Sequence, residues 1–171
     1  MTGIRRLNHA VLFVSDLDRA VSFYTDVLGF RVIERSEGRM NAAFMRAADS
    51  ENHHDLGLFG LGAGVPRAPR GSTGLYHLAW QVDTVDQLAT LRQPLIDSGA
   101  FSGESSHGAT LSLYGADPDG NEFEVQWMRP REAWGDYATK GVVERLDLAA
   151  EVAKWSGVGT ADELGTPVRA D

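Results

Sequence analysis

The chain contains one pattern twice, and this repeat restricts its fold more than any other feature. The first copy, HAVLFVSDLDRAVSFYTDVLGF, begins at His9, and the second, HLAWQVDTVDQLATLRQPLIDSGAF, begins at His77. In each copy a short strand-like run leads into an amphipathic helix, which ends at a glycine, Gly29 or Gly99. The repeat therefore predicts two modules of the same architecture.

Both predicted helices have a capping residue and an apolar stripe. In the first, Asp16 or Ser15 can cap the amino terminus, and the stripe consists of Ala20, Phe23, Tyr24, Val27 and Leu28. In the second, Asp83 is the expected cap, and the stripe consists of Val85, Leu88, Leu91, Leu95 and Ile96. Pro94 has no backbone donor, so we expect it to kink or shorten the second helix.

Three further strand-like segments follow each helix, which gives a βαβββ unit twice. They are RVIERSE, NAAFMRAA and HDLGLFGL in the first half, and FSGESS, ATLSLYGA and EFEVQW in the second. One such unit buries too little apolar surface to be stable alone, so we expect the halves to pair into one curved mixed sheet. The predicted fold class is α+β, with modules at about 5–62 and 73–128 in a domain of residues 1–130.

Two segments lie outside these modules. Residues 60–74, GLGAGVPRAPRGSTG, are rich in Gly and Pro and are interpreted as a linker or lid. Residues 131–171 are expected to form a helical extension with a flexible tail. Within it, GVVERLDLAAEVAKWSG has apolar residues at helical spacing, namely Val142, Leu146, Ala149, Val152 and Ala153. The last stretch, VGTADELGTPVRAD, is expected to be frayed.

Composition excludes several classes of function. The net charge is −8, and Lys and Arg are scattered along the chain, which does not favour nucleic-acid binding. No run approaches the roughly 18 apolar residues of a membrane helix, and the amino-terminal apolar stretch is too short for a signal peptide. The absence of cysteine excludes disulfides, thiolate catalysis and cysteine-based metal sites. We therefore expect a cytoplasmic protein that binds neither membrane nor nucleic acid.

Two histidines and one glutamate in the strand-like segments are candidate metal ligands. Strand alternation places His77 and Glu124 on polar faces, and it places His9 with Leu7, Val11 and Phe13. A carboxylate between Phe123 and Val125 is costly to bury unless it is paired or bound to a metal. Two imidazoles and one carboxylate that leave one side of the ion open are the usual ligands of non-haem Fe(II) oxygenases.

Each candidate also has a purely structural interpretation. A single strand histidine is more often hydrogen-bonded structure than a ligand, and Glu124 alone is often a solvated edge residue. The repeat favours the metal site, because His9 and His77 open equivalent strands. Glu124 lies 47 residues after His77, and His54 lies 45 residues after His9. His54 is therefore roughly the first-half counterpart of Glu124.

The repeated unit and the run LYGADPDGNEFEV resemble the vicinal oxygen chelate superfamily, which includes glyoxalases, extradiol dioxygenases and antibiotic-binding proteins. The resemblance covers about residues 5–130. It implies that His9, His77 and Glu124 bind the metal, with Fe(II) expected first and Mn(II) or another divalent metal as alternatives. Within DPDGN, residues 117–120 are predicted to form a tight turn that starts the last strand.

Within this superfamily, the chain looks most like small single-domain catechol 2,3-dioxygenase-like members. NHHDLGLF resembles the motif whose histidine acts as acid and base, which maps onto His54. Tyr114 matches the tyrosine that hydrogen-bonds the catecholate, and His107 is the candidate for a second pocket histidine. The structural interpretations are a solvated loop for His54 and a core position for Tyr114. The resemblance implies an extradiol-type ring-cleaving dioxygenase, with a small aromatic substrate and O₂ as partners, in a homodimer.

Two alternatives stay open. A glyoxalase-type lyase or isomerase needs a carboxylate base and a glutamate ligand in the first half, where only His54 or Asp55 is near. A non-catalytic antibiotic-binding protein of the bleomycin-resistance type shares the fold and needs no metal. The complete set of His9, His77 and Glu124 favours the enzyme, because a binding protein has no need for all three.

Overall fold

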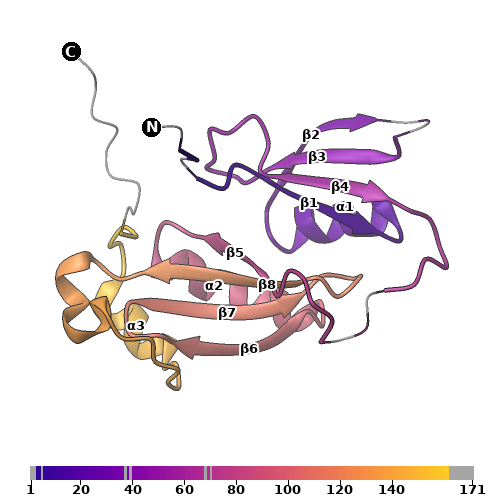
Figure 1. Cartoon of the computed structure of the whole chain (residues 1–171). Coiled ribbons are helices and arrows are strands. Elements are labelled where there is room, and N and C mark those ends of the chain that lie inside the picture. The colour runs from indigo at the N-terminus through magenta and orange to yellow at the C-terminus, as the bar shows by residue number, and fades with distance from the viewer. Residues whose placement is uncertain are drawn as a thin grey trace, which may run out of the picture. The chain divides into compact units, whose positions relative to one another are not determined.

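The chain divides into two compact units, each built around one βαβββ module (Figure 1). The structure, a computed structural model, describes residues 3–161 apart from 5, 37, 39, 68 and 70. One unit consists of Met1–Leu78 and Ala116–Asn121, and the other of Ala79–Gly115 and Glu122–Asp171. The predicted α+β class and the repeated module are confirmed, but the described strands form two four-stranded sheets and not the single sheet that was predicted.

The first unit is a four-stranded sheet with one helix. Its elements are β1 (Ala10–Val14), α1 (Leu17–Asp26), β2 (Arg31–Ser36), β3 (Ala42–Arg46) and β4 (Leu56–Gly60). The strand order is β1-β4-β3-β2, with β1 parallel to β4 and the other pairs antiparallel. Asp16 caps α1 by accepting a hydrogen bond from the Arg19 amide at 3.0 Å, and the left-handed Gly29 follows the helix.

The second unit repeats this plan. It contains β5 (Leu78–Gln81), α2 (Val85–Asp97), β6 (Phe101–Ser106), β7 (Thr110–Ala116) and β8 (Glu122–Met128), in the order β5-β8-β7-β6. The core lies between α2 and the sheet, where Leu88, Leu95 and Trp127 are fully buried. Alternation along β8 therefore directs one set of side chains into this core and the other set, which includes Glu124, to the opposite face.

The start and the length of α2 differ from the prediction. Thr84, and not Asp83, is the cap: its hydroxyl accepts from the Gln87 amide at 3.2 Å, and the Gln87 side chain reaches back to the Thr84 amide. Pro94 does not shorten the helix, which continues to Asp97. A proline removes a single backbone bond, and burial of the apolar stripe of α2 against the sheet keeps the helix formed.

The described part of the carboxy-terminal extension, residues 131–161, contains two short 3-10 helices, η1 (Arg131–Ala133) and η2 (Gly135–Ala138), and one α-helix, α3 (Leu148–Trp155). The helix predicted over 141–157 is thus confirmed only for its second half. Glu144 instead forms a backbone bridge with Ser106, and Asp147 caps α3. The described residues contain no helix long and apolar enough to cross a membrane.

Residues 158–161 are not frayed, contrary to the prediction for the last stretch. The Thr160 amide donates to the Asp83 carbonyl at 2.6 Å, and the Ala161 amide donates to the Met128 carbonyl at 3.1 Å. These bonds to residues far away in the sequence hold the segment in place. The rest of the predicted tail, residues 162–171, lies outside the described residues.

The DPDGN segment forms the predicted tight turn, and it docks on α1 within the first unit. The buried Asp117 carboxylate accepts hydrogen bonds from the Asp119 amide at 2.9 Å and from the Asn121 amide at 2.8 Å. It also accepts from the Tyr24 hydroxyl of α1 at 3.2 Å. Burial of Tyr24, followed by the nearby Asp117 charge, raises the pKa of this phenol far above its usual range.

We predict that Tyr24→Phe lowers the free energy of unfolding by about 1 kcal/mol at neutral pH, because one hydrogen bond to a buried carboxylate is lost. Because the folded state resists loss of the Tyr24 proton, the wild-type protein should lose stability as the pH rises above the usual tyrosine value of 10.0. The variant should show a smaller alkaline loss. Urea unfolding at about pH 7 and pH 10.5 measures both effects.

The matched control is Tyr76→Phe, since Tyr76 is exposed and should leave the stability unchanged at both pH values. If Tyr24→Phe and the wild-type protein lost the same stability between the two pH values, the coupling between Tyr24 and Asp117 would be disproved.

Candidate functional site

In the first unit, two of the predicted site residues lie against each other. His9 directly precedes β1, and its ring centroid is 4.4 Å from that of His54, which lies two residues before β4. The parallel pairing of β1 with β4, in which Ala10 pairs with Leu56, brings the residues just before these two strands together. The His9 Nδ1–H donates to Asn8 Oδ1 at 2.9 Å, which leaves Nε2 as the nitrogen able to bind a metal.

His54 is held in a small group of rings. Its centroid lies 5.3 Å from the Phe44 ring, and its Nδ1 lies 3.0 Å from His53 Nδ1. Desolvation lowers the pKa of His54, and electrostatic interaction with the neighbouring His9 and His53 lowers it further. At neutral pH the His54 imidazole is thus favoured in its neutral form, which can accept a proton.

The face of the first sheet that carries His9 is apolar and is not covered by α1. Its side chains Leu7, Val11 and Phe13 are exposed, as expected from strand alternation, whereas Leu12 and Val14 are buried. At its centre Gly57 packs between Val11 and Phe44, where a Cβ would be 3.4 Å and 3.7 Å from their side chains.

His77 directly precedes β5, just as His9 precedes β1. Its ring centroid lies 4.8 Å from that of Tyr76. Ala79 and Gln81 are exposed, whereas Leu78 and Trp80 are partly buried, which matches the predicted faces of this strand. Both histidines therefore lie directly before equivalent strands, as expected from the repeat.

In the second unit, Glu124 belongs to a chain of hydrogen bonds along one face of the sheet. The Tyr114 hydroxyl lies 3.3 Å from Glu124 Oε1 and 2.6 Å from His107 Nε2. Ser105 Oγ lies 3.0 Å from the same nitrogen. Glu124 is only 8% exposed, although its strand neighbours Phe123 and Val125 point into the core on the other face. The structure thus brings three of the predicted site residues, Glu124, Tyr114 and His107, together.

Tyr114 is kept protonated by its surroundings. Partial burial raises the pKa of its phenol, and the neighbouring Glu124 charge adds to this effect. At neutral pH the hydroxyl therefore keeps its proton and can act as a hydrogen-bond donor.

Sequence reasoning missed two partners in this network. Ser105 precedes the predicted His107 by two residues, and strand alternation alone could have found it. The other is the Val142 carbonyl, which lies 2.7 Å from His107 Nδ1. No local pattern predicts a contact between residues 35 positions apart.

The three predicted metal ligands are divided between the units, with His9 and His77 in the first and Glu124 in the second. Within the described part of the chain, no three His, Asp or Glu residues are grouped so that they could hold a metal ion. The triad therefore stays a prediction. Its chemistry fits a divalent metal, because His9 presents Nε2 and Glu124 supplies a carboxylate.

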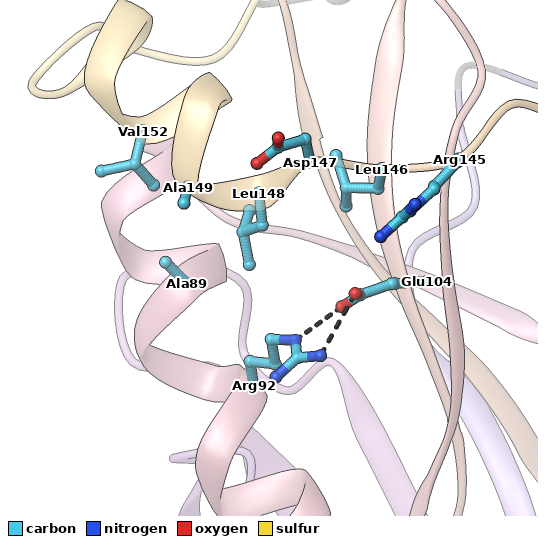
Figure 2. A pocket seen from close by; sticks show the side chains of 9 residues that line it. All are labelled: Ala89, Arg92, Glu104, Arg145, Leu146, Asp147, Leu148, Ala149 and Val152. Carbon is cyan, nitrogen blue, oxygen red and sulfur yellow. Dashed lines mark hydrogen bonds and ion pairs between the residues drawn. The ribbon is translucent and has the colours of Figure 1, made fainter.

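A cavity of about 580 Å³ lies elsewhere, on the helix-covered side of the second sheet (Figure 2). It is lined by Ala89 and Arg92 of α2, by Glu104 of β6, and by residues of the extension. Arg92 donates to both carboxylate oxygens of Glu104, at 2.6 and 3.2 Å. Glu104 and Ser105 are adjacent in β6 and point to opposite faces, so the sheet separates this cavity from Tyr114.

Comparison with known proteins agrees with this architecture. Residues 6–125 match the family model described as the Glyoxalase/Bleomycin resistance protein/Dioxygenase superfamily. A solved glyoxylase/bleomycin resistance protein/dioxygenase domain from Frankia sp. EAN1pec superposes with a TM-score of 0.62. It is 24% identical, and the match covers 75% of this chain and 93% of that one, which establishes a shared fold.

Two curated relatives point to different chemistry. "Biphenyl-2,3-diol 1,2-dioxygenase 3" of Rhodococcus globerulus is 37% identical over 74% of this chain and 65% of its own length. A lactoylglutathione lyase of Haemophilus influenzae is 34% identical over 68% of this chain and 87% of its own length. The chain thus spans just under two thirds of the dioxygenase.

Proposed function

Because the chain belongs to the Glyoxalase/Bleomycin resistance protein/Dioxygenase superfamily, we propose that it is a metal-dependent, extradiol-type dioxygenase that cleaves a catechol-like ring with O₂. The observation that most supports this proposal is the contact of Tyr114 with both His107 and Glu124. The similarity to a biphenyl-diol dioxygenase supports the same chemistry. The homodimer and the cytoplasmic location stay predictions.

His9, His77 and Glu124 would hold the metal, with Fe(II) as the expected ion and Mn(II) or another divalent ion as alternatives. Such an ion, when bound, brings the substrate and O₂ together and mediates electron transfer between them. The protein contributes two neutral imidazoles and one carboxylate, which leave a net positive charge for an anionic substrate.

His54 would act as the acid and base. Its lowered pKa favours the neutral imidazole, which can accept the proton of a substrate hydroxyl. Its ring contact with His9 places it beside a proposed ligand, where the substrate oxygens would lie. Returning that proton later in the reaction would complete the cycle.

Tyr114 would orient the substrate. Its raised pKa keeps the hydroxyl protonated, so the group can donate to a substrate oxygen. The orientation of the substrate would determine which of its ring bonds lies near O₂. Ring opening next to the hydroxylated carbons would follow from this orientation.

A glyoxalase-type activity is the second candidate, and the similarity to the Haemophilus lyase favours it. Such an activity needs a free carboxylate base. Near His54 the available acid is Asp55, but it is buried and accepts hydrogen bonds from the Ala47 amide, Ser50 and Asn52. This carboxylate already organises the turn before β4, which favours the dioxygenase.

We predict stoichiometric iron or manganese in protein purified without oxygen, measured by elemental analysis. His9→Ala, His77→Ala and Glu124→Ala should each lose most of this metal, because one of three ligands is removed. His53→Ala, which removes an exposed histidine outside the triad, is the matched control and should keep the metal. Metal-free protein that binds a cationic aromatic antibiotic tightly would instead indicate a binding protein.

We further predict that His54→Phe keeps the metal but slows turnover of a substituted catechol by about 100-fold, because the acid/base group is lost. The assay loads Fe(II) without oxygen, admits air and follows the yellow ring-opened product. Unchanged turnover would show that His54 has no acid/base role. Methylglyoxal with glutathione, tested in parallel, would reveal a glyoxalase-type activity instead.

A further inference from the structure

The carboxy-terminal extension holds the turn that carries His107. Ser106 and Glu144 exchange two backbone hydrogen bonds, at 3.0 and 2.9 Å. The next turn residue, Gly108, has a left-handed φ of 79°, and a Cβ there would overlap the Tyr137 ring. The extension therefore packs directly on residues 106–108, at a position where only glycine leaves room for it.

Arg129, which lies just before the extension, is hydrogen-bonded to the same turn. Its amide donates to the Ala109 carbonyl at 2.9 Å, and its guanidinium donates to the Gly108 carbonyl. The guanidinium also pairs with Glu151 of α3 at 2.5 Å, and both side chains are largely buried. Because this ion pair is shielded from water, it ties α3 to the turn more firmly than a surface pair would.

The residues that directly follow α3 are fixed as well. Ser156 and the Gly157 amide each donate to the Asp86 carboxylate of α2 at 2.8 Å. Gly159 forms a backbone bridge with Thr84. The extension is thus attached both to the turn at residues 106–108 and to α2, although it lies beyond the residues that match the family model.

Between these attachments, the Val142 carbonyl meets His107. Its oxygen lies 2.7 Å from His107 Nδ1, and a carbonyl can only accept, so Nδ1 must carry the proton. In the neutral ring, Nε2 is then the acceptor. The Tyr114 hydroxyl lies 2.6 Å from Nε2 and 3.3 Å from Glu124 Oε1, and it can donate its single proton to either of these two acceptors.

We propose that the extension is a positioning element of the active site: the Val142 carbonyl fixes the tautomer of His107, and His107 in turn holds the Tyr114 hydroxyl beside Glu124. His107 is a positioning residue in this scheme, because it acts through Tyr114. The consequence for catalysis rests on the proposed dioxygenase function, whereas the tautomer does not depend on it.

The first test is a ¹⁵N NMR spectrum of histidine-labelled full-length protein, with His107 assigned through His107→Gln. We expect the Nδ1–H tautomer for His107 in the wild-type chain. A His107 ring that carries its proton on Nε2, or that exchanges freely between both forms, would overturn the proposal whatever the enzyme's activity.

The second test breaks the backbone bridge next to Val142. Glu144→Pro removes the amide that donates to Ser106, whereas Glu144→Ala removes only the side chain and is the matched control. We expect Glu144→Pro to mix the two His107 tautomers and Glu144→Ala to keep the wild-type spectrum. Identical His107 signals in the two variants would refute a role for the extension.

The same pair of variants tests the catalytic consequence. With equal metal content, kcat/KM for a catechol should be about tenfold lower in Glu144→Pro than in Glu144→Ala, since the substrate is less well oriented. Equal kcat/KM values in the two variants, despite mixed His107 tautomers in Glu144→Pro, would overturn the proposed link between the His107 tautomer and the position of Tyr114. If the wild-type protein turned over no catechol but showed the Nδ1–H tautomer of His107, the proposed dioxygenase function would be refuted. The tautomer assignment would still stand.

Discussion

Burial of the apolar side of β8 is the constraint on which the candidate site depends. Phe123, Val125 and Trp127 are at most 2% exposed, and they lock the strand against α2. Gly115 of β7 makes room for this packing, since a Cβ there would collide with the Phe123 ring and with the Ala100 carbonyl. Once the strand is locked, the side chain of Glu124 must point to the opposite face, and its carboxylate needs polar partners there.

Tyr114 is within hydrogen-bond distance of Glu124, and His107 is in turn within hydrogen-bond distance of Tyr114. Tyr114 extends from β7, next to β8 in the sheet, whereas His107 lies just after β6 and depends on the Val142 carbonyl for its orientation. A hydrogen-bonded row of this kind is rigid only when each member has a partner. The extension supplies the last partner, which is the Val142 carbonyl. A segment beyond the residues that match the family model thus contacts the candidate site.

In the first unit, strand pairing positions two of the histidines. His9 and His54 lie just before β1 and β4, and the parallel pairing of these strands makes them neighbours. The DPDGN turn comes from the second half of the sequence but docks on α1 through Tyr24 and Asp117. Sequence repeats and structural units therefore do not coincide along the whole chain.

The sequence by itself determined the repeated module, the faces of the strands and the types of residue at the candidate site, because alternation and helical spacing follow from local geometry. It placed Tyr114 ten residues before Glu124, and adjacent strands brought them into contact. It gave the wrong cap for α2 and too long a helix in the extension. Only the tertiary structure decided that Val142 meets His107, because contacts between distant segments arise from packing that no local pattern encodes.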